Sequence, residues 1–294
     1  MTWLAWRQQR LQILISIGLV LLTTAALVYL RFDAASLLPN QAAVRERYQG
    51  LVFNMPLFLL ALPVLLGMFA GAPLFAREIE QGTLVFGLTQ SISRTRWWAT
   101  KLAVAGLPVT VAVTALGLVG SWALEPVNFL LSSRMSTPLF EIQGTTIGAY
   151  TVLAFAIGAT AGLLVRSTLA GMAITLVTYL GVLVVVADVL RPHYQAPLYV
   201  AERFRPGPLN LPSDAWLVGH GYLDAAGNEI SVSRINCQGD IATCFADQGV
   251  VQRFSQFHPG DRFWPFQLAE SGLVLLLVGG LLALGAWALR RRLS

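Results

Sequence analysis

The sequence predicts an all-α polytopic membrane protein with six transmembrane helices, and three observations support that prediction. Hydrophobic residues make up 55% of the 294 residues, whereas charged residues make up only 12%. A soluble domain carries roughly 25% charged residues, so this chain has too few polar groups to cover a surface in water. Six apolar runs are each long enough to cross a hydrocarbon core of about 30 Å. The expected spans are residues 11–30, 51–76, 102–124, 145–165, 168–187 and 266–289.

The first apolar run, residues 11–30, contains no charged residue and ends at Arg31. A cleaved signal peptide has a shorter apolar core of roughly 7–15 residues, with a small-residue cleavage site close behind it. We therefore interpret this run as an uncleaved anchor. Residues 31–50, which are polar, are expected to form a loop.

The second run, residues 51–76, contains Pro63, Gly67 and Gly71. A proline inside a helix removes a backbone hydrogen bond, so Pro63 should kink this span. The two glycines form a GxxxG face that permits the close approach of another helix. That helix belongs either to the same subunit or to another subunit.

The fourth and fifth runs, residues 145–165 and 168–187, are separated only by Arg166 and Ser167. A turn this short predicts an antiparallel pair of helices. The region 188–265 then forms the one large polar segment, rich in Pro, Gly, Asn and Asp, with no helical period. Within it, residues 222–230 predict a β-hairpin with a Gly-Asn turn.

Placing both termini in the cytosol satisfies the excess of basic residues that cytosolic loops carry. Ten basic residues then fall inside, against four in the two short outer loops, and among the acids only Glu78 and Glu80 fall inside. We therefore predict a plasma-membrane protein with cytosolic termini and residues 188–265 on the outer face. The inner basic residues are Arg7, Arg10, Arg77, Arg94, Arg96, Lys101, Arg166, Arg290, Arg291 and Arg292.

The tryptophans give an independent test, because aromatic belts form at both membrane interfaces. Seven of the eight lie near predicted span ends, and only Trp216 does not. Trp97 and Trp98 are expected to anchor the inner end of the third span at the lipid interface.

The only two cysteines, Cys237 and Cys244, lie in the predicted outer region. That side is oxidising, so the pair predicts a disulfide. Two free thiols, or a bond present in part of the population, remain the alternatives.

The positions of the charges exclude several functions. No charged residue lies at the centre of a span, and Glu125, Asp188 and Glu270 lie at outer ends where water should reach them. A charge within the membrane usually marks an ion or proton path, so an ion-coupled transporter is disfavoured. The three histidines lack the spacing of a metal site, and no metal is expected. No basic stripe with interleaved aromatics indicates nucleic-acid binding.

The single lysine, Lys101, excludes ATP hydrolysis by this chain. A phosphate-binding loop needs G-x-x-x-x-G-K-[ST], and no glycine loop precedes Lys101. Any energy for uphill movement must come from a partner. A membrane enzyme is also disfavoured, because no G-x-S-x-G elbow is present.

Residues 77–102 resemble the segment between the second and third spans of type-2 ABC exporter permeases. The family pattern is close to E-x-E-x-G-T-L, then L, then P-[VI]-S-R, then K. Ser91 replaces the usual proline, which puts the local bend in doubt. Residues 262–267 and Glu270 are also similar to permeases of this class from actinobacteria. The matching residues are Glu78, Glu80, Gly82, Thr83, Leu84, Leu88, Ile92, Ser93, Arg94 and Lys101.

The resemblance implies that residues 77–101 form a cytosolic coupling helix in a groove of a separate ATP-binding subunit. It also implies a second permease subunit, in a homodimer or a heterodimer. ATP and Mg would bind to the partner, with no cofactor in this chain. The expected coupling residues are Glu78, Glu80, Gly82, Thr83, Ser93, Arg94, Lys101 and Arg166.

The physical roles of these residues fit the implied contact. Gly82 permits a sharp change of direction and Thr83 suits a helix cap. Glu78 and Glu80 would pair with basic groups of the ATPase, or with Arg94 and Arg96. Enforcing the orientation in the membrane is the simpler alternative for the basic residues.

Two functions follow as hypotheses. One is the membrane subunit of an ATP-driven exporter, which moves an amphipathic drug, lipid or peptide. The other is a non-transporting partner of an ABC ATPase, which transmits a mechanical or regulatory signal to the outer face.

Overall fold

The computed structural model of the chain describes residues 2–82, 93–131, 133–231 and 240–292. Within these ranges, six helical stretches are long and apolar enough to cross a membrane, so the expected number of spans is confirmed. They consist of α1 (Thr2–Leu37), α2 (Gln41–Leu66) with the π-helical turn η1 (Gly67–Gly71) and α3 (Pro73–Glu80), α5 (Arg94–Ala123), α7 (Thr146–Val165), α8 (Thr168–Val184) with η3 (Val185–Leu190), and α10 (Phe263–Arg292).

The loop expected over residues 31–50 is wrong. Helix α1 runs on to Leu37, and α2 begins at Gln41 after Asn40, whose side chain accepts a hydrogen bond from the N–H of Ala43 at 3.2 Å. Asp33 accepts a hydrogen bond from the Tyr48 hydroxyl, which joins the two helix ends. Because paired polar residues can belong to a helix beyond its apolar run, hydropathy alone predicted the end of α1 and the start of α2 incorrectly.

Helix α7 is the central helix of the bundle. Seventeen of its twenty residues are buried, and it contacts α2, η1, α5, α8 and α10. Its small side chains allow this close packing: a Cβ on Gly158 would lie 2.4 Å from the Gly67 oxygen, and one on Gly162 would lie 2.3 Å from the Ala72 oxygen. The glycine faces of two spans therefore pack together within one chain.

The span changes helix type next to Pro63, where a kink was predicted. Helix α2 passes through Pro63 without a break, and η1 begins four residues later. The N–H of Gly67 is shared between the carbonyls of Pro63 and Val64. This wider turn brings the two glycines of η1 against α7.

The prediction of an all-α fold is wrong for the region after η3. A four-stranded antiparallel sheet in the order β1-β4-β2-β3 lies between the fifth and sixth spans. Its strands are β1 (Leu198–Arg203), β2 (Trp216–Leu223), β3 (Glu229–Ile230) and β4 (Gln252–His258), and a short helix, α9 (Ile241–Asp247), precedes β4. Short strands leave no apolar run, so hydropathy could not reveal them.

The β-hairpin expected over residues 222–230 is confirmed. Tyr222 pairs with Ile230, and Leu223 pairs with Glu229. The carboxylate of Asp224 accepts hydrogen bonds of 2.8 Å from two backbone N–H groups of the turn. These bonds, first among them that from Asn228, lower the pKa of Asp224 below its usual value.

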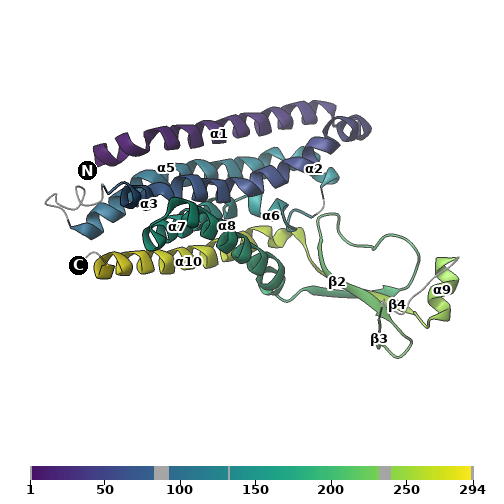
Figure 1. Cartoon of the computed structure of the whole chain (residues 1–294). Coiled ribbons are helices and arrows are strands. Elements are labelled where there is room, and N and C mark those ends of the chain that lie inside the picture. Colours follow the sequence, from purple (N-terminus) through teal and green to yellow (C-terminus); the bar gives the residue numbers. More distant parts are fainter. Residues whose placement is uncertain (1, 83–92, 132, 232–239, 293–294) are drawn as a thin grey trace.

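Figure 1 shows the sheet at one end of the bundle, whereas α1 begins and α10 ends at the opposite end. An even number of spans places both termini on the same side of a membrane. We call these the sheet end and the termini end. The assignment of the termini end to the cytosol remains a prediction from the basic residues.

Candidate functional site

The predicted coupling segment, residues 77–101, lies at the termini end. Helix α3 ends at Glu80, and Gly82 follows with φ of +67°, a conformation that suits glycine. Helix α5 begins at Arg94, where the Ser93 hydroxyl accepts a hydrogen bond from the N–H of Arg96 at 3.4 Å. Residues 83–92 lie outside the described residues, so the prediction of a cap at Thr83 and that of a coupling helix are untested.

Glu78 pairs with Lys101 of α5, a partner that the sequence did not suggest. Its predicted pairing with basic groups of the ATPase, or with Arg94 and Arg96, stays a prediction. Lys101 is 4% exposed, and its ammonium group lies 4.8 Å from the centre of the Trp97 ring. Phe75 packs on Trp97 at 5.5 Å between ring centres, which sets α3 against the start of α5. The carboxylate of Glu78 therefore lies within reach of Lys101.

Glu80 links α3 to α8. Its carboxylate accepts hydrogen bonds from the backbone N–H of Thr168 at 2.8 Å and from the Thr168 hydroxyl at 2.7 Å. A negative charge at a helix N-terminus is favourable because the backbone N–H groups there have no partner within the helix. Arg166 ends α7 in the same turn, in a left-handed conformation with φ of 59°. Glu78 and Glu80 thus tie α3 to both α5 and α8.

Trp97 and Trp98 do not lie at the lipid interface, and that prediction is wrong. They are 5% and 8% exposed. A Cβ on Gly285 would lie 3.2 Å from the Trp98 ring, so this ring packs against α10. Both side chains belong to the apolar cluster between α3, α5, α7 and α10.

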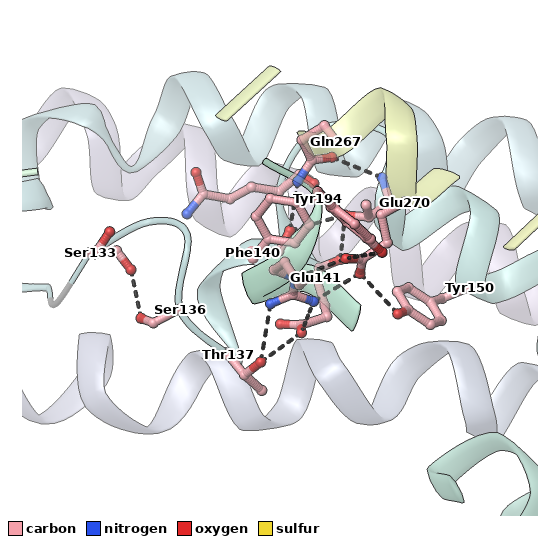
Figure 2. A network of polar contacts seen from close by, with 12 residues as sticks. Ser133, Ser136, Thr137, Phe140, Glu141, Tyr150, Tyr194, Gln267 and Glu270 are labelled. Carbon is pink, nitrogen blue, oxygen red and sulfur yellow. Dashed lines mark hydrogen bonds and ion pairs between the residues drawn. The ribbon is translucent and has the colours of Figure 1, made fainter. Parts of the chain in front are cut away.

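A buried charged cluster lies at the sheet end, where Arg191 pairs with Glu141 and Glu270. Figure 2 labels the two glutamates among the polar contacts of this region. Nε and Nη2 of Arg191 each donate to one oxygen of Glu270 at 2.8 Å, and Nη2 also donates to Glu141 at 2.5 Å. The three residues are at most 2% exposed. They come from the 3-10 turn η4 (Arg191–His193), the short helix α6 (Leu139–Ile142) and α10.

Neutral side chains complete the cluster (Figure 2). The hydroxyls of Tyr150 and Tyr194 donate to Glu270 at 2.9 and 3.3 Å, and the Thr137 hydroxyl donates to Glu141 at 2.8 Å. A buried ion pair is tolerated best when further hydrogen bonds satisfy its remaining atoms. These hydroxyls supply such bonds to both oxygens of Glu270 and to Oε1 of Glu141, whereas Oε2 of Glu141 is buried without a hydrogen-bond partner among the described residues. The cluster fixes α6, α7, α10 and η4 to one another.

Gln267 adds a neutral link in the same place. Its side-chain oxygen accepts hydrogen bonds from the N–H groups of Thr145 and Thr146 at 2.9 and 3.1 Å, which caps the start of α7. Its amide group donates to the carbonyl of Phe140 at 2.8 Å. One side chain of α10 therefore holds the connection between α6 and α7.

The expectation that water reaches Glu270 is wrong. Glu270 lies two turns inside α10, and α6 and η4 fold over it and remove it from solvent. Arg191 and Glu141 were not singled out from the sequence, where they belong to connecting segments. A signal was present, because Glu141 lies among the apolar residues 138–142 and Arg191 lies four residues after the fifth apolar run.

His258 joins the sheet to the bundle. Its Nδ1 accepts a hydrogen bond from Arg262 at 2.8 Å, and its Nε2–H donates to the carbonyl of Pro192 at 3.1 Å. This arrangement requires the neutral ring. Burial, together with Arg262, lowers the pKa of His258.

The predicted disulfide stays a prediction, since Cys244 lies in α9 but Cys237 lies outside the described residues. In the part of the chain that the structure describes, no group of three or more His, Cys, Asp or Glu side chains is arranged to hold a metal ion.

The sequence also matches a known family. The family model described as "ABC-2 membrane transporter related" matches residues 17–191, from within α1 to Arg191 of the buried cluster. No curated protein and no solved structure is significantly similar to the chain. The matched segment is more than half of the 294 residues and holds most of the bundle. With six apolar helices and this match, the chain is a multi-pass membrane permease component of the ABC-2 membrane transporter related family.

Proposed function

We propose that the chain is the permease subunit of an ATP-driven exporter, which moves an amphipathic drug, lipid or peptide. A separate ATP-binding subunit, carrying ATP and Mg, would dock on residues 77–101, and a second permease subunit would complete the substrate path. The observation that carries this proposal is the pair of links from α3: Glu78 to Lys101 and Glu80 to Thr168. These links join α3, α5 and α8, which belong to three different spans, at the two ends of the predicted docking segment.

The two links give a force applied at residues 77–101 a route into the bundle. Movement of α3 would pull α5 through Lys101 and α8 through Thr168. Helix α3 also packs on α7, which continues to the sheet end. There Tyr150 of α7 contacts Glu270, so α7 connects the predicted docking side to the buried charged cluster.

The class of substrate rests on the polarity of the spans. The charges that the structure describes within the spans lie near helix ends, either in the links at the termini end or at the sheet end. An amphipathic molecule needs no buried charge along its path, whereas an ion usually does. The distribution of basic residues supports a cytosolic termini end and an outer sheet.

A second function is supported by the attachment of the sheet. His258 of β4 bonds to Pro192 and Arg262, which flank the fifth and sixth spans. Movement of these spans would therefore reorient the sheet, as in a non-transporting partner that signals to the outer face.

Reconstitution with the ATP-binding subunit in proteoliposomes separates the two functions. An exporter should show ATP hydrolysis stimulated by some members of a panel of amphipathic dyes, lipids and peptides, with ATP-dependent accumulation of the same compounds. A non-transporting partner should hydrolyse ATP without either response. Absence of stimulation and accumulation across the panel would contradict the exporter assignment.

A further inference from the structure

An apolar groove of about 370 Å³ runs between α5, α7 and α10 near the termini end. Ala99, Ala103 and Gly106 of α5 line one wall, and Leu282 of α10 lines the other. Phe155 of α7 forms the floor, since a Cβ on Gly106 would lie 3.0 Å from its ring. A volume of this size is typical of sites for small molecules.

The length of the groove corresponds to one leaflet of a bilayer. Its lining on α5 extends from Trp98 to Thr110, which is about 18 Å at 1.5 Å per residue. Half of a hydrocarbon core is about 15 Å. A single extended acyl chain from the leaflet at the termini end would fit along it.

On each of the two helices α5 and α10, an arginine lies beyond the residues that line the groove, toward the termini end. Arg96 continues the row of α5 positions that lines the groove, because 96, 99, 103, 106 and 110 share one helix face. Arg290 follows Leu282 by two turns on α10. Both arginines are exposed, and the contact of the Trp98 ring with Gly285 brings their helix ends together.

We propose that this groove binds one acyl chain of an anionic phospholipid, whose phosphate group is held by Arg96 and Arg290. The apolar walls suit the chain, and guanidinium groups suit phosphate because they donate paired hydrogen bonds. A second copy that docked by the same face would bring its own two arginines against these. Like charges therefore disfavour that occupant.

Lipid binding to the purified full-length chain tests the proposal by native mass spectrometry. The probes are phosphatidylglycerol and phosphatidylcholine with identical acyl chains. Wild type should bind the first phosphatidylglycerol about 30-fold more tightly than phosphatidylcholine, whose ammonium group offsets its phosphate charge. The two arginines contribute about 1 kcal/mol each near an anionic group, and about 1.4 kcal/mol is a factor of ten. Inorganic phosphate added in equal amount should not displace the lipid, because the acyl chain holds it in the groove.

Matched substitutions on α5 separate the groove from the rest of the surface. Ala103→Trp, which fills the groove, should abolish the tight site, whereas Ala115→Trp, at an exposed position outside it, should leave binding unchanged. The double variant Arg96→Gln/Arg290→Gln should bind both lipids equally. It leaves the core untouched and so remains informative if Ala103→Trp does not fold.

Several outcomes would overturn the proposal. Equal binding of the two lipids by wild type would remove the role of the arginines, and displacement by inorganic phosphate would remove that of the acyl chain. Unchanged lipid binding with loss of dimers in Ala103→Trp would identify the groove as a contact between copies. None of these outcomes depends on ATP hydrolysis or on transport.

Discussion

At the scale of residues, the buried charged cluster contains two ion pairs whose side chains are almost completely removed from solvent. Arg191 neutralises one of two carboxylates that have almost no contact with solvent. Removing one partner from a buried pair is strongly destabilising because an uncompensated charge is left behind. The stability of the sheet end therefore depends on Arg191 more than on any exposed arginine.

Arg191→Met should lower the free energy of unfolding by about 3–5 kcal/mol, since Glu141 and Glu270 would lose their only guanidinium within the described cluster. Thermal unfolding in detergent, followed by tryptophan fluorescence, measures the effect. Arg191→Met/Glu270→Gln should recover part of the loss. A single variant as stable as wild type would show that the cluster contributes little.

His258 predicts a pH dependence. Its pKa is lowered in the folded protein, so the unfolded chain binds more protons as the pH falls below about 6.5. Stability is therefore complete above that pH and decreases as the pH falls towards the lowered pKa of the folded state. Unfolding followed by the fluorescence of Trp216, whose ring lies 5.5 Å from that of His258, should report it.

The variant His258→Gln should remove this pH dependence, because an amide can still donate to Pro192 and accept from Arg262 without titrating. The control is His220→Gln, on the exposed side of β2, which should keep it. If both variants keep the wild-type slope between about pH 5 and 6.5, His258 is not its source.

At the scale of elements, the contact of α7 with η1 depends on glycines. Gly158→Ala should destabilise the bundle by about 1–3 kcal/mol, since its Cβ would overlap the Gly67 oxygen and force the helices apart. Gly181→Ala in α8, with no atom within 4 Å of the new Cβ, should be neutral or slightly stabilising. Equal unfolding temperatures for the two variants would contradict the importance of this contact.

The sequence predicted elements wherever a local property defines them. Twenty apolar residues in a row suffice for a span, and a Gly-Asn turn between short strands suffices for a hairpin. The helical extension through residues 31–37 and the pairing of β1 with β4 depend instead on contacts between distant residues. No local pattern contains that information.

In the candidate site, too, the sequence identified residues from local patterns but not their distant partners. Glu78, Glu80 and Lys101 were identified from the family pattern, but their partners were not, because Glu78 lies 23 residues from Lys101 and Glu80 lies 88 residues from Thr168. Arg191 and Glu141 appeared to be ordinary loop residues. Their burial follows only from how α6 and η4 close over the end of α10.

At the scale of the whole molecule, the links from α3 and the buried charged cluster lie at opposite ends of α7. The first site would receive force from the ATP-binding subunit, and the second holds the sheet end together. A helix packed through glycines on several neighbours moves with them, so α7 is suited to carry a displacement from one end to the other. Transmission from α3 to the rest of the bundle would therefore depend on the ion pair between Glu78 and Lys101.

The most direct test measures whether ATP moves the sheet end of the bundle through this ion pair. Spin labels at Leu118 of α5 and Leu268 of α10, both exposed, report the distance between the two helices in the complex with the ATP-binding subunit. Trapping with ATP and vanadate should change that distance in wild type and in the charge-swapped Glu78→Lys/Lys101→Glu. In Lys101→Met the complex should still form, but the distance should stay constant. A wild-type change in Lys101→Met would contradict the account.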